Sequence, residues 1–248
     1  MATRNADLTA RRAWRPSFHL VMALVMCAFV FGGFGMTYLG PLANDTFPPA
    51  PPIVHLHGAV FFSWMVLLVV QSALVNARNV RLHRSLGMFG IAVATLVVTM
   101  GTFITLAGTS GVDAGFVGDG AGVFFLSVVA PPSFAVLFVM AIRAVRVPLV
   151  HRNLILIATI AILMPGINRV YMTGVGLDYV PFYKTYLTMD VLLAAVLWHE
   201  WRVAGRVSGA TWIGAAIVVV PQFLLAPVSA TQEWLDFVHA LGSLVYYR

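Results

Sequence analysis

Long apolar stretches separated by short polar segments run along most of the chain. A helix needs roughly 20 residues to cross the ~30 Å hydrocarbon layer of a membrane, and seven stretches come close to that length. They cover residues 18–40, 53–76, 85–107, 121–142, 153–173, 184–203 and 210–229. The pattern predicts an all-α fold, a polytopic membrane protein whose seven transmembrane helices form one bundle over residues 18–229.

The two ends of the chain differ from this bundle in pattern. Residues 1–17 form a basic segment before the first apolar stretch. In residues 230–248 the apolar side chains recur at helical spacing and share one face, which predicts a C-terminal helix at the membrane interface. The prolines at 131, 132, 165 and 221 lie within apolar stretches and predict kinked helices.

Composition strengthens the membrane prediction. Hydrophobic residues make up 60% of the 248 residues and charged residues only 10%, against roughly 45–50% and about 25% in soluble domains. The net charge of +6 comes from arginines beside apolar stretches, so we expect membrane lipids, and no nucleic acid, as partners. Cys27 is the one cysteine, which excludes an internal disulfide and a cysteine metal cage.

The basic residues also predict an orientation. Most of them flank the same ends of the apolar stretches, and basic residues favour the cytoplasmic side. This group consists of Arg4, Arg11, Arg12, Arg15, Arg78, Arg81, Arg84, Arg143, Arg146, Arg152, Arg202 and Arg206. The amino terminus is therefore expected in the cytoplasm and the carboxyl terminus outside, with the protein in a bacterial inner membrane.

Polar residues inside the apolar stretches are the candidates for function, because such groups are costly in a membrane and face the bundle interior. His57, Trp64 and Gln71 follow one another at intervals of seven and share a helix face. Arg169 and Asp190 lie at a similar depth by helical rise, so an ion pair between them is plausible, and Tyr171 is a further polar companion.

These six residues predict an outward-facing polar pocket that binds a small anionic or amphipathic ligand. The protein would then be a non-enzymatic ligand-binding protein, or an accessory subunit that joins a membrane-protein partner or forms a homo-oligomer. A structural ion pair and an interfacial histidine are the alternative interpretations. No motif of a known catalytic mechanism occurs, so no catalytic residue is assigned.

The alternative function is a membrane redox protein with b-type haem, whose axial ligands would come from His57, His83 and His151. His55 and His57 lie about 200° apart on a helix and cannot chelate one ion, so no metal site is predicted. The cofactor is therefore unknown from the sequence, with haem b as the candidate.

Several of these residues form a pattern that resembles a group of uncharacterised bacterial integral membrane proteins with a domain of unknown function. The matching positions, within residues 53–205, are His57, Trp64, Gln71, His83-Arg84-Ser85-Leu86-Gly87, His151-Arg152 and Arg169. The resemblance implies membership of a membrane family and no particular activity. The layout also looks like that of di-haem cytochrome b reductases, but the outer end lacks a second histidine in a neighbouring span.

Overall fold

The computed structural model describes residues 15–109 and 119–244, and every regular element in that part of the chain is a helix. The elements are α1 (Phe18–Phe34), the π-helix η1 (Gly35–Leu39), α2 (Gly40–Ala43), α3 (Pro52–Asn76), α4 (Val80–Thr109), α5 (Asp119–Arg143), α6 (Pro148–Ala161), α7 (Met164–Arg169), the π-helix η2 (Val170–Gly174), α8 (Phe182–Ala204), α9 (Gly209–Ser229) and α10 (Gln232–Leu244). The all-α prediction is confirmed. Residues 1–14 of the basic segment and the last four residues of the C-terminal segment lie outside the described residues.

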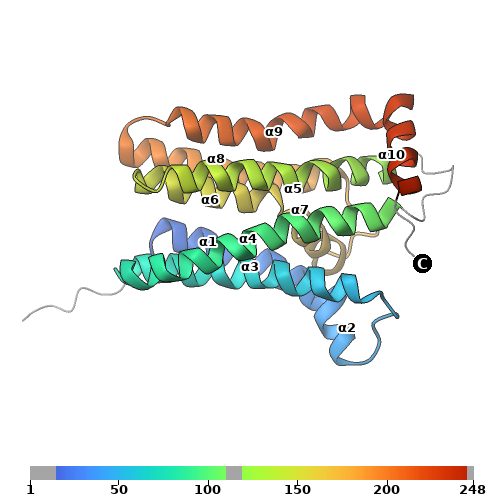
Figure 1. The fold of residues 1–248 in the computed structure, drawn as a ribbon, viewed down its shortest axis with the longest axis horizontal. Coiled ribbons are helices and arrows are strands. Elements are labelled where there is room, and N and C mark those ends of the chain that lie inside the picture. The colour runs from blue at the N-terminus through green and yellow to red at the C-terminus, as the bar shows by residue number, and fades with distance from the viewer. Residues whose placement is uncertain (1–14, 110–118, 245–248) are drawn as a thin grey trace, which may run out of the picture.

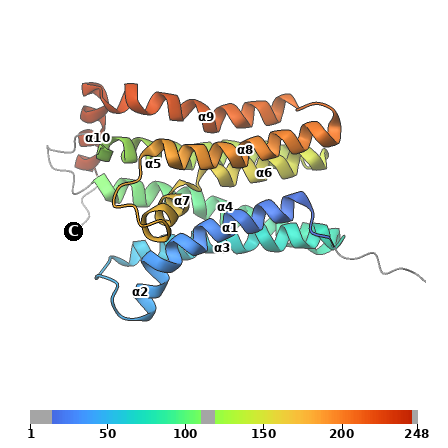
Figure 2. The ribbon, with the colours of Figure 1, turned by 180° about the vertical axis from the view of Figure 1, so that it is seen from behind.

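The long helices run along one direction in two layers (Figures 1 and 2). The first layer holds α1, α3 and α4, and the second holds α5, α6, α8 and α9. The contacts of α4 with α5 and of α1 with α6 and α7 join the layers. The short helix α10 crosses one end of the bundle, where it contacts α4 and α9.

Five helical segments are long and apolar enough to span a membrane, and a sixth is added if the bent pair α6 and α7–η2 forms one span. The sixth predicted span, residues 184–203, corresponds to α8, which is a helix of 23 residues but does not meet that test. Its sequence carries Lys184, Asp190, Glu200 and Arg202, which lower its mean hydropathy. The described chain is thus a helical bundle with five to six candidate membrane spans.

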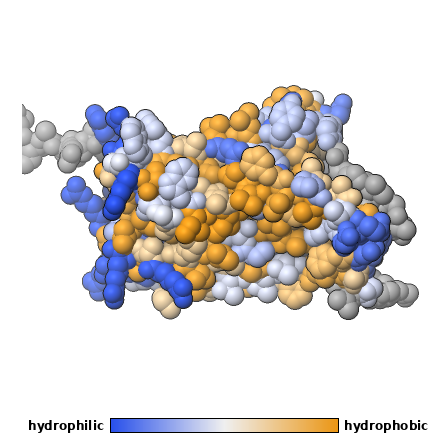
Figure 3. Space-filling view, turned by 90° about the horizontal axis from the view of Figure 1, so that it is seen from above, coloured by the Kyte–Doolittle hydropathy of each residue, from blue (hydrophilic) through white to orange (hydrophobic). Residues whose placement is uncertain are grey.

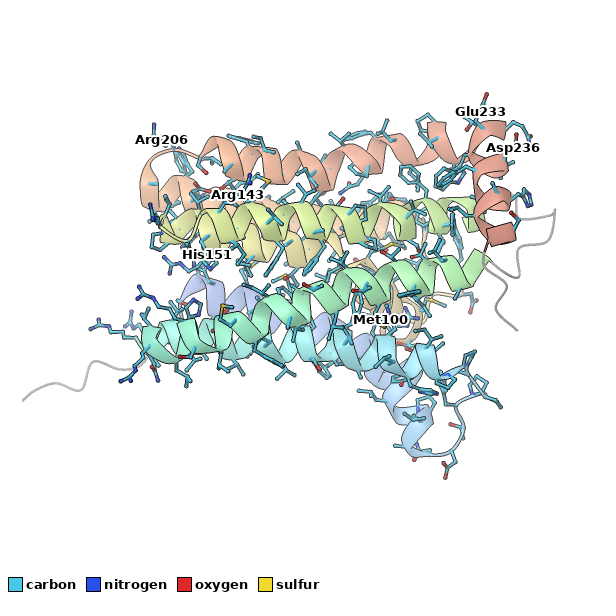
Figure 4. All side chains as sticks on the ribbon, in the orientation of Figure 1. Met100, Arg143, His151, Arg206, Glu233 and Asp236 are labelled. Carbon is cyan, nitrogen blue, oxygen red and sulfur yellow. The ribbon has the colours of Figure 1, made fainter. Side chains whose placement is uncertain are left out.

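The surface supports a membrane setting for this bundle. A hydrophobic band covers the middle of the molecule, and hydrophilic residues gather toward its ends (Figure 3). Large side chains such as Phe223 (76% exposed) and Met88 (71% exposed) lie on the outside of the helices. Arg143 and Arg206 lie at one end of the bundle, whereas Glu233 and Asp236 lie at the other (Figure 4). Exposed apolar area of this extent is typical of a protein embedded in lipid.

The fifth predicted span is a broken helix. Helix α6 ends at Ala161, the chain continues through two residues, and α7–η2 departs at an angle of 53°. Pro165 lies in the first turn of α7, where its missing N–H removes no helical hydrogen bond. The prolines of α5 and α9 lie inside helices that the structure shows as continuous.

Close packing of α1 against α7 fixes the position of this broken span. A Cβ atom added to Gly33 would lie 2.5 Å from the carbonyl oxygen of Gly166, so the two backbones are nearly in contact. Small residues permit this approach between membrane helices. A Cβ atom on Gly35 would meet nothing within 4 Å. The close approach thus involves Gly33 and not Gly35, and it holds the start of α7 against α1.

Candidate functional site

A cavity of about 220 Å³ lies in the bundle, with residues of both layers in its wall. Helices α1, α3 and α4 contribute from the first layer, and α5, α6, α8 and α9 from the second. The break between α6 and α7 forms another part of the wall, because residues 161–166 line it. Most lining side chains are apolar, and the chemically distinctive ones are His57, Trp64, Tyr186 and Gln222. The cavity is therefore an apolar space with a few polar groups.

His57 of α3 is one of these polar groups. Its imidazole lies against the ring of Phe61, with centroids 4.3 Å apart. The ring also lies near the main chain of Met100 in α4 (Met100 is labelled in Figure 4). Its Nδ1 is buried and has no hydrogen-bond partner in the protein. His57 thus brings an unsatisfied polar atom to the wall of an apolar cavity.

Trp64 lies two turns further along α3 and is only 4% exposed. Its Nε1 donates a hydrogen bond to Thr159 Oγ1 of α6 at 3.3 Å. The indole packs edge-on against Phe134 of α5, with ring centroids 5.0 Å apart. These contacts hold the indole in one position, so Trp64 forms a rigid aromatic wall that joins the two layers.

Tyr186 of α8 was not among the residues predicted from the sequence. It lines the cavity, and its buried hydroxyl has no hydrogen-bond partner in the protein. The one indication in the sequence is that Tyr186 precedes Asp190 by four residues and so shares its helix face. Gln222 of α9, which also lines the cavity, donates from Nε2 to Asp190 Oδ1 at 2.9 Å.

The structure gives the predicted partners Arg169 and Asp190 different contacts. Arg169 Nη1 donates to the carbonyl oxygen of Pro165 at 3.1 Å, and its guanidinium lies 4.1 Å from the centroid of the Phe34 ring. Asp190 accepts from Gln222 instead. The expected ion pair is therefore wrong, because a similar depth along two helices does not fix the direction in which each side chain points.

The remaining predicted pocket residues also lie apart from the cavity lining. Tyr171 hydrogen-bonds Thr188 through its hydroxyl at 2.9 Å, which ties η2 to α8. Gln71 lies near the opposite end of α3, where its main chain is near the ring of His83 and its Oε1 is buried without a partner. Of the six predicted pocket residues, the cavity wall contains His57 and Trp64.

Of the three candidate haem ligands, two lie close together and the third lies apart from them. His83 and His151 open α4 and α6, and their ring centroids are 6.4 Å apart with an angle of 78° between the rings. His151 Nδ1 is 2.8 Å from the carbonyl oxygen of Ala141. His151 lies at the arginine-rich end of the bundle (Figure 4), whereas His57 lines the cavity. The structure therefore pairs His83 with His151 and separates His57 from them.

A buried polar network at the arginine-rich end was missed by the sequence analysis. Asn153 of α6 is fully buried, and its amide group forms hydrogen bonds with two side chains. Its Oδ1 lies 2.9 Å from His19 Nε2, and its Nδ2 donates to Glu200 Oε2 at 2.8 Å. Glu200 is 2% exposed and also accepts from the main-chain N–H of Ser208 at 3.0 Å. The network links α1, α6 and α8 to the start of α9.

Histidine rings extend this network. His199 stacks on Phe18 with centroids 3.9 Å apart, and it meets His19 edge-on at 5.0 Å. Within the described residues no group of three or more His, Cys, Asp or Glu side chains is arranged to hold a metal ion. The network is therefore best described as a set of hydrogen bonds and ring contacts between helices.

Fold, surface and buried polar groups together define a helical membrane protein with an internal apolar cavity. Comparison of the chain with models of known protein families, with curated proteins and with solved structures gives no match.

Proposed function

We propose that the chain crosses the membrane seven times, with α8 as the sixth span along the chain. Helix α8 has 23 residues, packs against α6 and α9, and lies parallel to them in the second layer (Figure 2). Its charged residues have sites that a membrane tolerates. Lys184 and Arg202 lie near the ends, where long side chains reach the interface, and Asp190 and Glu200 accept hydrogen bonds from other helices.

An odd number of spans with the arginine-rich end in the cytoplasm places the carboxyl-terminal helix outside. The test uses a Cys27→Ala background with a single cysteine at Val145 or at Tyr179, which lie in loops at opposite ends. A membrane-impermeant maleimide applied to intact cells should label the cysteine at 179 and leave the one at 145 unlabelled. Labelling of both positions, or of 145 alone, contradicts this topology.

We further propose that the cavity binds a small amphipathic molecule and that the protein acts without catalysis, as a ligand-binding membrane protein. The observation that carries this proposal is the presence of two buried unpaired polar atoms, His57 Nδ1 and Tyr186 Oη, in residues lining one apolar cavity. Unsatisfied buried polar groups are costly, and a ligand that pairs with them would remove that cost. Since Arg169 has other contacts, the ligand is neutral rather than anionic.

A cavity-filling variant tests this proposal. Ala130 of α5 lines the cavity, so Ala130→Phe should occupy part of it, whereas Val136 of the same helix is 49% exposed and serves as the control Val136→Phe. The probe is p-xylene, added to the detergent-purified protein during thermal unfolding. A ligand at 100 times its Kd stabilises the folded state by about 2.7 kcal/mol. We expect the Tm to rise for the wild type and Val136→Phe and not for Ala130→Phe; equal effects in all three, or none in any, contradict the proposal.

A second candidate function is haem binding by His83 and His151, and their ring geometry favours it. Two imidazoles that ligate one iron from opposite sides, with metal–nitrogen bonds of about 2 Å, have centroids about 6 Å apart. The observed 6.4 Å is close to this value. The hydrogen bond of His151 Nδ1 to a carbonyl oxygen leaves Nε2 as the ligating atom. Arg84 and Arg152, next in sequence to the two histidines, would pair with the haem propionates.

An absorbance spectrum tests the haem candidate. The full chain is expressed with ample haem supply and purified in detergent. A Soret band that shifts on reduction and disappears in both His83→Ala and His151→Ala supports it. His57→Ala is the matched control and should leave the band unchanged. A wild-type spectrum without a Soret band excludes this function.

A further inference from the structure

A groove of about 510 Å³ lies between α4 and α5, and it shares no lining residue with the internal cavity. On α4 its lining runs from Ala94 to Leu106, a rise of about 18 Å at 1.5 Å per residue. Half of the ~30 Å hydrocarbon layer, the depth of one leaflet, is about 15 Å. The groove is therefore long enough to take a lipid acyl chain along much of its length.

The two helices touch beside the outer part of this groove. A Cβ atom added to Gly101 would lie 3.2 Å from Pro131 Cγ, and Thr105 Oγ1 donates to the carbonyl oxygen of Ser127 at 3.1 Å. From this contact α4 and α5 diverge toward the arginine-rich end of the bundle (Figure 1). The groove thus narrows toward the outer end and widens toward the arginines.

The lining of the groove is apolar in effect. Its floor includes Ala94 and Phe134, which are 2% and 0% exposed. The polar lining residues are the exposed Thr95, Thr99 and Thr102, and each hydroxyl donates to the carbonyl four residues earlier in α4, at 2.5–2.9 Å. Because these donors are used within the helix, the groove offers methyl groups and rings to its occupant.

The wide end of the groove leads to positive charge. Arg143 is exposed and lies one helical turn beyond Val139, the last lining residue of α5. Side chains in a helix lean toward its amino terminus, so Arg143 leans back toward the groove. Residues 78–93 and 137–152, the arginine-rich ends of α4 and α5 with their flanks, contain six arginines and no acidic residue. An anionic group at this end therefore meets no competing carboxylate from either segment.

We propose that the groove binds one anionic phospholipid, with an acyl chain along α4 and α5 and the phosphate beside Arg143. A helix, with a diameter of about 10–12 Å, cannot follow the groove to the point where α4 and α5 touch, whereas an acyl chain is thin and flexible. Clustered arginines at the end of membrane helices attract anionic headgroups. This lipid site is separate from the internal cavity and does not depend on the ligand proposed there.

The test measures lipid binding to the delipidated full chain in detergent by native mass spectrometry. The probes are phosphatidylglycerol, phosphatidylcholine with the same acyl chains, and glycerol 3-phosphate, which carries the phosphate without the chains. Ala135→Phe fills the groove from α5, and Thr99→Phe fills it from α4. Val136→Phe is the control for both, because Val136 is 49% exposed and does not line the groove.

Arg143→Gln removes the charge assigned to the headgroup. Its control is Arg206→Gln, because Arg206 lies at the same end of the bundle but in the loop between α8 and α9 (Figure 4). Circular dichroism during heating establishes that each variant is folded before its lipid binding is compared with that of the wild type.

We expect the wild type and both controls, Val136→Phe and Arg206→Gln, to bind one phosphatidylglycerol at least tenfold more tightly than phosphatidylcholine. Arg143→Gln should weaken phosphatidylglycerol about fivefold and leave phosphatidylcholine unchanged, the effect of one basic residue beside an anionic lipid. Ala135→Phe and Thr99→Phe should weaken both lipids at least tenfold. Glycerol 3-phosphate should not bind at the same concentrations.

Three results would overturn the lipid site. The first is unchanged lipid binding in both groove-filling variants, and the second is equal affinity of the wild type for the two lipids. The third is a dimer of the wild type that both groove-filling variants abolish without a change in lipid binding, which would make the groove a contact between two copies of the chain. Tight binding of glycerol 3-phosphate would likewise overturn it in favour of a site for free phosphate groups.

Discussion

The buried amide of Asn153 provides the sharpest test of how the helices are held together. It is fully buried, and its two ends contact side chains of α1 and α8. The substitution Asn153→Leu keeps the approximate size of the side chain and removes both hydrogen bonds. It leaves His19 Nε2 and Glu200 Oε2 without their partner in a buried setting.

The expected cost follows from these two lost partners. Leaving a buried polar group unsatisfied costs about 1–3 kcal/mol, and more for a charged one. Measured interhelical hydrogen bonds in membranes are weaker, on average about 0.6 and at most about 1.7 kcal/mol. Glu200 keeps its bond from the Ser208 N–H, which reduces the loss. We therefore expect Asn153→Leu to lower the free energy of unfolding by about 2–4 kcal/mol.

The assay is unfolding of the detergent-solubilised protein by increasing SDS, followed by circular dichroism. Asn168→Leu is the matched control, since its amide lies 3.9 Å from the sulfur of Met172, a weak contact. This control should change the free energy of unfolding by less than about 0.6 kcal/mol, the scale of an average interhelical bond. Equal effects of the two substitutions would refute the reasoning that the Asn153 bonds hold α1, α6 and α8 together.

Two further changes test packing in the same SDS assay. Gly33→Ala places a Cβ 2.5 Å from the Gly166 oxygen and should lower the free energy of unfolding by about 1–3 kcal/mol. Gly35→Ala has open space around it and should leave that free energy unchanged or raise it by up to about 1 kcal/mol. Equal losses in both variants would contradict the close approach. Trp64→Phe removes the bond to Thr159 and enlarges the cavity, so we expect a loss of about 1–3 kcal/mol together with retained p-xylene binding. Unchanged stability would show that the indole bond contributes nothing.

The positions of the helices could be predicted from the sequence because apolar stretches and polar breaks are strong local features. Each of the seven predicted stretches coincides with a helical segment, and a further helix covers residues 232–244. Pro165 marks the region of the 53° break in the fifth segment, but the size of the angle could not be predicted, because residues 161–164 are as apolar as their neighbours. Pro165 has no N–H to donate to the carbonyl oxygen of Ala161, where α6 ends, and the close contact of Gly166 with α1 depends on a segment more than 100 residues away.

The site was harder to predict than the fold. Spacing by seven placed His57 and Trp64 on one face of α3, and both line the cavity. The same reasoning failed for Arg169 and Asp190, because helical rise gives depth and says nothing about the direction of a side chain. Tyr186 was overlooked because a tyrosine near a helix end is common at membrane interfaces, and its buried hydroxyl depends on neighbours from other helices.

The buried polar groups of this bundle differ in a way that separates structural from ligand-binding roles. At the arginine-rich end, Asn153 and Glu200 satisfy each other, so their loss should lower stability. In the cavity, His57 Nδ1 and the Tyr186 hydroxyl have no partner, so replacing either ring by phenylalanine removes an unsatisfied atom. Such a change should leave the free energy of unfolding unchanged or raised. A loss of stability in His57→Phe as large as in Asn153→Leu would mean that the imidazole holds helices together rather than serving a ligand.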